Sequence, residues 1–390
     1  MLKRIQTELK RLTETKSLRE FHVAAGRDPG SIKIRGKKVT DFTNWDSLNL
    51  NSDARFVSAF QREAEISGVG SMAPRASSGT SPAHFALEKR LADFLGAETA
   101  LLFSSANQVV LSLVSSLLGE GDCVIVDEGV HGRVVDAATL VHAETLDFET
   151  TDPDSLARAL EISKPYKNKL VVCEAVNPIT GDALNLKTIT EITNRFAVPW
   201  VLDESYSLGI LGLRGAGLLD GLELPQNLLC RFGSLSFGMG GYAAFFAGPK
   251  FLSDYLIYRS RTFTTEPAIP PALAAALETA INIAELEHGK RTRLLELTER
   301  AKSALKLSGL SLSGNANAFF VMIPFAKKTN ATEIAEGLFQ RGFLVDVVTS
   351  INVMDQGASI RVIMNAAHKD KDIDDFCAAL TELNKRVNKA

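Results

Sequence analysis

The stretch Gly233–Gly248 reads G-S-L-S-F-G-M-G-G-Y-A-A-F-F-A-G. It follows the apolar run Leu229–Phe232 and contains a second one, Tyr242–Ala247, with glycine and serine between them. Short apolar runs with such turn residues at both ends are typical of buried strands. The pattern therefore predicts two strands, with Phe237 on the connection between them.

The same alternation extends outward over residues 83–247. Four further apolar runs predict strands, and longer patterns between them predict helices. The strands are Ala100–Phe103, Cys123–Asp127, Leu170–Cys173 and Trp200–Asp203, and the helices are Ala83–Phe94, Val109–Leu118, Asp154–Ile162 and Leu186–Phe196. This order predicts an α/β fold with a mostly parallel sheet covered by helices. Ligands of such sheets bind at the carboxyl ends of the strands, where His131 and Asp203 fall.

A second alternation begins at Pro270 and Pro271, which open a predicted helix that runs to about Leu307. Strands are predicted after it near Phe319–Ile323, Phe343–Val348 and Ile360–Met364. We expect a small C-terminal α+β domain here. The chain thus divides into an N-terminal arm (1–49), a large domain (50–280) and a small domain (281–390).

The composition is that of a globular protein with a large core. The chain has 390 residues, of which 45% are hydrophobic, and a formal net charge of −3. This mixed charge gives no reason to expect a nucleic-acid partner. The four cysteines are widely spaced. They predict reduced thiols in a cytoplasmic protein, and we expect no metal site.

The first residues predict an amphipathic helix. Leu2, Ile5, Leu9 and Leu12 recur every three or four residues, and no apolar signal core is present. We expect this helix to pack on its own subunit or on a partner, because acidic residues on its polar side disfavour a membrane surface. The uncharged run 101–119 is as long as a membrane span, but its serines and amides favour a buried strand, loop and helix.

The stretch Gly233–Gly248 resembles the lysine segment of the α-oxoamine synthases, whose pattern is roughly G-T-F-S-K-A-L-G-S-F-G-G-F-V-A-G. These pyridoxal-phosphate-dependent acyltransferases include 8-amino-7-oxononanoate synthase and serine palmitoyltransferase. Five further segments resemble the family's motifs in the same order: Arg75–Glu88, Asp127–His131, Val172–Asp182, Asp203–Gly209 and Ile360–His368. The resemblance implies the fold-type I architecture of pyridoxal-phosphate-dependent transferases, which is built as a dimer with shared active sites.

The family's catalytic lysine falls on Phe237 in this resemblance. That lysine forms a Schiff base with the cofactor. Phenylalanine has no amine, so we expect covalent binding of pyridoxal phosphate to be absent. Lys250 lies thirteen residues further along the sequence, beyond the predicted strand, and does not replace it.

The resemblance also implies roles at other positions. Asp203 matches the acid that contacts the pyridine nitrogen, and His131 matches the residue that stacks on the ring. Tyr206 replaces a histidine that reaches the phenolic oxygen of the cofactor. Further candidate cofactor-binding residues are Ser105, Asn107, Glu174 and Ser234, and candidate substrate-binding residues are Arg361, Arg75 and His84.

Two more changes weaken the implied cofactor site. The family's phosphate-binding loop is about two residues shorter here, at Ser104–Asn107, and lacks the glycine that permits close backbone approach. Pro178 replaces a serine, which removes a hydroxyl and a backbone donor. Several independent contacts to one ligand are therefore altered.

Three functions are consistent with these changes. The one we favour is a catalytically impaired or silent subunit, which pairs with a lysine-bearing homologue or regulates it. The second is an active acyltransferase similar to 8-amino-7-oxononanoate synthase, which joins an amino acid to an acyl-CoA or acyl-carrier-protein thioester with loss of carbon dioxide. The third is a noncatalytic homodimer that binds acyl thioesters or acts as a scaffold.

Overall fold

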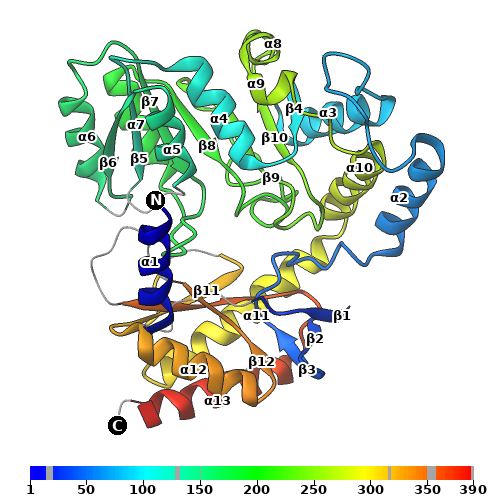
Figure 1. Ribbon diagram of the computed structural model, residues 1–390, viewed down its shortest axis with the longest axis vertical. Helices are drawn as coiled ribbons and strands as arrows, with labels where there is room; N and C mark the ends of the chain where they lie inside the picture. Colours follow the sequence, from blue (N-terminus) through cyan, green and yellow to red (C-terminus); the bar gives the residue numbers. More distant parts are fainter. Residues whose placement is uncertain (15–20, 128–131, 151, 315–317, 349–356, 388–390) are drawn as a thin grey trace.

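The computed structural model describes residues 1–14, 21–127, 132–150, 152–314, 318–348 and 357–387. A seven-stranded sheet forms the upper part of the molecule in Figure 1, with strand order β4-β10-β9-β8-β7-β5-β6. Its strands are β4 (Thr99–Phe103), β5 (Cys123–Asp127), β6 (Glu144–Phe148), β7 (Lys169–Glu174), β8 (Trp200–Asp203), β9 (Leu228–Ser234) and β10 (Ala244–Gly248). The pairs from β9 to β6 are parallel, and β10 runs antiparallel to both of its neighbours. The predicted mostly parallel sheet is confirmed.

Helices cover both faces of this sheet. Alternate side chains of the strands enter different apolar clusters, as the two-residue repeat of a strand requires. One face packs on α4 (Ala106–Leu117), α5 (Arg133–Leu140), α8 (Lys250–Arg259) and the short α9 (Arg261–Thr264). The other face packs on α6 (Pro153–Ile162) and α7 (Leu186–Phe196), with α3 (Pro82–Leu95) and α10 (Pro271–Leu286) under β4 and β10. Helix α2 (Ala54–Ser67) packs on α10.

The lower part of Figure 1 holds two smaller sheets. One has the antiparallel order β11-β14-β13, from β11 (Phe320–Phe325), β14 (Ala358–Ile363) and β13 (Asp346–Val348). The other joins the N-terminal strands β1 (Ala24–Asp28), β2 (Ser31–Ile34) and β3 (Lys37–Asp41) to β12 (Phe343–Leu344). Helices α11 (His288–Leu307), α12 (Lys328–Gln340) and α13 (Asp370–Val387) complete this part. Because β3 pairs with β12, the N-terminal strands lie against the C-terminal part; the boundaries 49/50 and 280/281 stay predictions.

The prediction of one long helix from Pro270 to Leu307 is wrong, because two helices fill this range. Glu287 separates α10 from α11 with backbone angles φ −95° and ψ 68°, outside the helical region. Its carboxylate is held by Arg55 from α2 and by Lys290, 3.4 Å away. Arg291 donates to the carbonyl of Ala284, which satisfies one of the last acceptors of α10. Arg55, from outside the segment, therefore helps to fix the break together with Lys290 and Arg291 from within it.

The amphipathic helix at the N-terminus is present as α1 (Leu2–Glu14). It has no buried residue, and Leu2, Ile5 and Leu9 are exposed by 70%, 48% and 49%. The partner surface expected for its apolar side is therefore not supplied by the part of the chain that the structure describes. Within that same part, no helix is long and apolar enough to cross a membrane.

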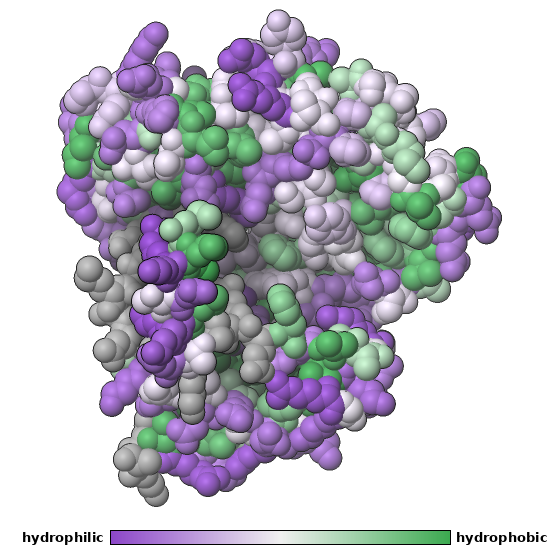
Figure 2. Space-filling model, viewed as in Figure 1, coloured by the Kyte–Doolittle hydropathy of each residue, from purple (hydrophilic) through white to green (hydrophobic). Residues whose placement is uncertain are grey.

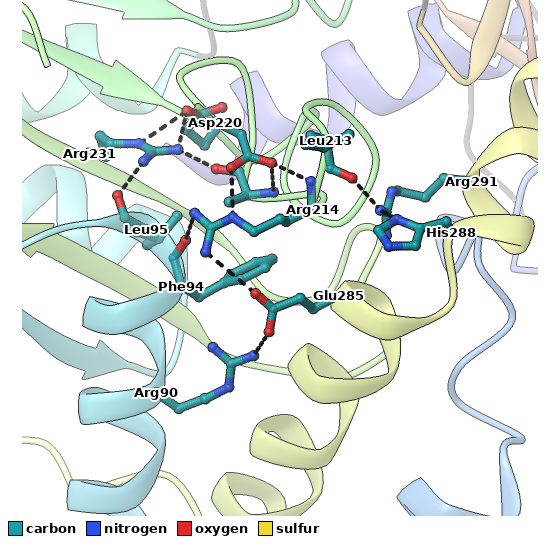
Figure 3. A network of polar contacts seen from close by, with 12 residues as sticks. Arg90, Phe94, Leu95, Leu213, Arg214, Asp220, Arg231, Glu285, His288 and Arg291 are labelled. Carbon is teal, nitrogen blue, oxygen red and sulfur yellow. Dashed lines mark hydrogen bonds and ion pairs between the residues drawn. The ribbon is translucent and has the colours of Figure 1, made fainter. Parts of the chain in front are cut away.

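A polar network joins the large sheet to the helices that lead into the lower part of the molecule (Figure 3). Arg214, on the loop after β8, donates to Asp220 at 3.1 Å and to Glu285 of α10 at 3.4 Å. Arg90 of α3 pairs with the same Glu285. Arg291 of α11 donates to the carbonyl oxygen of residue 213 at 2.7 Å. The network ties the loop that follows the candidate site to three helices.

Candidate active site

The carboxyl ends of the parallel strands bring three predicted site residues together. Glu174 ends β7, Asp203 ends β8 and Ser234 ends β9. Glu174 and Asp203 are directly paired in the ladder, and all three residues are buried. Tyr206 and Phe237 follow on the loops after β8 and β9, so the edge predicted from the strand order carries the candidate site.

The side chains of the adjacent acids Asp203 and Glu204 lie in different surroundings. Glu204 is fully buried, and Arg231 of β9 donates to its Oε1 through Nε at 3.1 Å and Nη2 at 2.7 Å. The backbone N–H of Leu218 donates to its Oε2 at 2.9 Å. Because successive residues at a strand end face opposite sides, Asp203 points away from this pair and into the site.

Asp203 is already paired with a cation of its own chain. Arg133, the first residue of α5, donates through Nη2 to Oδ2 of Asp203, and their side chains are only 9% and 3% exposed. The N–H of Ser205 donates to Oδ1 at 2.9 Å. Burial alone lowers the pKa of Arg133, but the attraction of Asp203, and then of Glu174, outweighs it and raises that pKa. Arg133 is not among the site residues predicted from the sequence, although it lies two residues after His131.

Next to this pair lies an aromatic cluster, formed by Trp45, Tyr206, Phe237, Phe319 and Phe320. The rings of Tyr206 and Phe237 are stacked, with centroids 5.0 Å apart and an interplanar angle of 19°. Trp45 contacts both, at 5.1 Å and 4.8 Å. Phe320 meets Tyr206 edge-on at 6.3 Å, and Phe319 meets Trp45 edge-on at 6.0 Å. Such pairs each contribute about 0.5–1.5 kcal/mol beyond the area they bury.

The glycines after Phe237 determine the position of its ring. Gly238 has φ 73°, and a Cβ atom there would lie 2.4 Å from the carbonyl oxygen of Leu208. Its N–H donates to the carbonyl of Trp45 at 3.1 Å. Gly240 has φ 68°, and its carbonyl accepts from Asn51 at 2.9 Å. The loop is therefore held against the segment 45–51, which brings Phe237 and Trp45 into contact.

Arg361 reaches the aromatic cluster from the smaller sheet. It lies on β14, and its guanidinium is 4.5 Å from the ring centroid of Trp45, a cation–π contact. It also donates to Asp346 at 3.2 Å. The pKa of the Tyr206 hydroxyl is raised, first by burial and next by Glu174, against the opposing effect of Arg361 and Arg133. The predicted Arg361 thus lies within electrostatic reach of Tyr206.

A cleft of about 360 Å³ opens beside Trp45 and Phe237. Its other lining residues are polar and include Arg27, Asn44 and Asn51. The described residues that line it include no lysine. A larger depression of about 1150 Å³ lies between α6 and α7, but none of the predicted site residues lines it.

The structure places Arg75 and His84 in internal contacts. Arg75 makes a bidentate pair with Glu88, at 2.6 Å and 2.9 Å, with both side chains under 10% exposed. His84 is fully buried, accepts from the N–H of Ser81 and contacts the carbonyl of Ile269 at 2.8 Å. Burial lowers the pKa of His84. Neither residue joins the aromatic cluster, and the predicted His131 lies outside the described residues.

The loop expected to hold a phosphate uses some of its donors internally. Ser105 caps α4, and its side chain accepts from the N–H of Gln108. The N–H and hydroxyl of Ser104 both donate to the side-chain oxygen of Gln108, at 3.2 Å and 2.5 Å. Asn107 is exposed to solvent. A helix N-terminus binds phosphate through free N–H groups, and the N–H groups of Ser104 and Gln108 are already bonded within the loop.

These residues do not fit pyridoxal phosphate in the way that the resembled family binds it. Position 237 has an aromatic ring in place of an amine, and Asp203 is already paired with the guanidinium of Arg133. Ser234 accepts from the N–H of Ser236 at 3.0 Å and donates its own N–H to Ser205. Lys250 stands at the exposed start of α8, paired with Asp254 at 2.8 Å.

Comparisons with known proteins identify the family. The family model described as "Aminotransferase class I and II" matches residues 40–380. The 8-amino-7-oxononanoate synthase of Anaeromyxobacter sp. (strain K) is 31% identical over 377 residues, which cover 96% of this chain and 94% of the relative. The enzyme of that name from Methylococcus capsulatus is 32% identical over 353 residues, covering 90% of each chain.

Solved structures share the fold. A serine palmitoyltransferase of Sphingomonas wittichii has a TM-score of 0.92 at 22% identity, covering 99% of this chain and 97% of that one. An 8-amino-7-oxononanoate synthase from Francisella tularensis has a TM-score of 0.78 at 21% identity, covering 89% and 98%. The predicted fold-type I transferase architecture is therefore confirmed. With the family match over most of its length, the chain belongs to the α-oxoamine synthases of the aminotransferase class I and II family.

Proposed function

We propose that the chain is a catalytically silent α-oxoamine synthase. The observation that carries this proposal is Phe237, whose ring stacks on Tyr206 where the family resemblance puts the Schiff-base lysine. In the chemistry implied by that resemblance, the amine holds the cofactor and takes the α-proton of the amino acid. An aromatic ring does neither, and the described lining of the adjacent cleft supplies no substitute lysine.

The second candidate is an active acyltransferase. The names of the relatives favour it, because those at 31% and 32% identity are called 8-amino-7-oxononanoate synthase. The comparisons contain no sign of a silent or regulatory role. This candidate needs an amine from another lysine, and its substrates would be an amino acid and an acyl-CoA or acyl-carrier-protein thioester.

We further propose that the chain works as a dimer, with a lysine-bearing homologue as the partner of a silent subunit. Apolar side chains are exposed on α2 and on the loop and helix after it, at the right of Figure 2. They are Val57, Phe60, Ile66, Val69, Met72 and Phe85, with Val69 82% and Met72 87% exposed. Exposed apolar patches of this kind mark protein–protein interfaces.

The four cysteines support the proposed cytoplasmic location. Cys123, Cys173, Cys230 and Cys377 are all unpaired and buried. Free buried thiols persist in the reducing environment of the cytoplasm.

Borohydride trapping tests whether the chain holds the cofactor covalently. The purified chain is mixed with pyridoxal phosphate, its visible absorbance is recorded, and the sample is reduced and mapped by peptide mass. We expect no Schiff-base band and no stoichiometric pyridoxyl-lysine. K250R is the matched control, since it removes the lysine nearest in sequence to position 237. A stoichiometric adduct on one lysine would overturn the proposal and make the active acyltransferase the function to assay.

A further inference from the structure

We propose that Arg133 is an internal cation that occupies the cofactor's place on Asp203, so that restoring a lysine at position 237 is not sufficient to restore cofactor binding. This inference rests on the proposed silent function and adds a second block to it. It concerns the Arg133–Asp203 pair at the end of β8 and the aromatic cluster beside it.

The pair is closed to solvent and to a competing cation. The side chains of Arg133 and Asp203 are 9% and 3% exposed. Oδ2 of Asp203 accepts from Arg133, and Oδ1 accepts from the N–H of Ser205. A protonated pyridine nitrogen needs the same carboxylate. In a buried site two cations on one carboxylate repel each other, so the ring and the guanidinium exclude one another.

Among the described residues, the local structure gives no reason for a cation at this position other than Asp203 and Glu174. Arg133 opens α5, and the N-terminal end of a helix disfavours positive charge. The attraction of Asp203 and Glu174 must therefore offset two unfavourable effects on the Arg133 cation, its burial and its place at the helix N-terminus.

The second buried pair of this sheet shows what a structural arginine looks like here. Arg231 donates to Glu204 and to the carbonyls of Leu95 and Ala216. Arg133 is hydrogen-bonded to Asp203 through Nη2, and its Nε has no hydrogen-bond partner among the described residues. Arg231 therefore links several elements by hydrogen bonds, whereas Arg133 is hydrogen-bonded to Asp203 and attracted by the Asp203 and Glu174 carboxylates.

The aromatic cluster occupies the space beside the pair. Tyr206 and Phe237 are stacked on each other, and Trp45 packs on both rings. Replacing Phe237 by lysine opens this stack but leaves the Arg133–Asp203 pair in place. Removing the guanidinium as well frees the carboxylate for a pyridine nitrogen. The two substitutions are therefore expected to be non-additive.

Four variants test this: F237K, F237K/R133Q, R133Q and R133Q/D203N. Each is titrated with pyridoxal phosphate, followed by Schiff-base absorbance and by mapping of the borohydride-reduced peptide. We expect F237K to bind weakly, and F237K/R133Q to bind at least about tenfold more tightly with its adduct on residue 237. Far-UV circular dichroism verifies that each variant is folded.

Thermal melting gives a second readout that does not need the new lysine. R133Q leaves Asp203 buried without its cation, so its Tm should fall. R133Q/D203N removes both charges, and its Tm should exceed that of R133Q. If F237K/R133Q does not fold, the comparison of R133Q with R133Q/D203N tests the role of Arg133.

The outcomes separate this inference from the proposed function. Equal binding by F237K and F237K/R133Q, or a Tm of R133Q/D203N no higher than that of R133Q, overturns the role of Arg133 and leaves the silent function standing. A stoichiometric pyridoxyl-lysine in the wild-type chain overturns the silent function itself. Tight binding by F237K/R133Q alone supports both.

Discussion

At the scale of single residues, the site is defined by which groups already have partners. Asp203 has a cation, and the Tyr206 and Phe237 rings are stacked on each other. Without Arg133, the Asp203 carboxylate would lack the cation that now pairs with it. Chemistry at this edge of the sheet therefore depends on contacts that form only in the folded chain.

Removing the Phe237 ring should destabilise the fold. F237A deletes the stacking on Tyr206 and the contact with Trp45. We expect a loss of about 2 kcal/mol in the free energy of unfolding, less than for a fully buried phenylalanine because the side chain is partly exposed. Urea denaturation measures it, with F251A as the control, since Phe251 is 68% exposed and should change stability by less than about 0.5 kcal/mol. An equal effect of both variants would show that the stack is not stabilising.

The buried histidines predict a loss of stability in acid. Burial lowers the pKa of both His84 and His368 in the folded chain. Below the ordinary histidine pKa of about 6.5, the unfolded state therefore binds more protons, and the free energy of unfolding falls as the pH decreases. Urea unfolding at several pH values between 7.5 and 5.5 measures this slope. H84Q should flatten it, and H22Q, at an exposed histidine, should not; equal slopes in all three proteins would contradict the account.

At the scale of elements, the loop from Phe237 to Gly241 is built on glycine. G238A places a side chain at φ 73° and 2.4 Å from the carbonyl of Leu208. We expect it to destabilise the protein by about 2 kcal/mol or more. G289A is the control, because a Cβ on this glycine of α11 meets nothing within 4 Å and should stabilise the helix by about 0.5–1 kcal/mol. Thermal melting compares them, and a neutral G238A would show that the loop is not held as described.

Sequence patterns predicted most elements of the large sheet because its strands are short apolar runs between turn residues. They placed the start of α4 three residues late, since the Ser105 cap lies before the apolar repeat. They missed the break at Glu287, which depends on Arg55 from a distant helix. They missed Arg133 for the same reason, because its partner Asp203 is 70 residues away in the sequence.

At the scale of the whole molecule, the exposed apolar side chains near α2 predict association. V69D/M72D should shift the protein to lower mass in sedimentation, because it places two charges in the proposed interface. L307D is the control, since Leu307 is 90% exposed at the end of α11 in the lower part of the molecule. A wild-type chain that sediments as a monomer at all concentrations, alone and with a lysine-bearing homologue, would contradict the proposed interface.

The central claim is that this α-oxoamine synthase fills its own cofactor site. A crystal structure of the wild-type chain, grown with excess pyridoxal phosphate, tests it most directly. The account predicts the Arg133 guanidinium on Asp203, Phe237 stacked on Tyr206, and no cofactor ring between them. A pyridine ring whose nitrogen contacts Asp203, with Arg133 displaced, would contradict it.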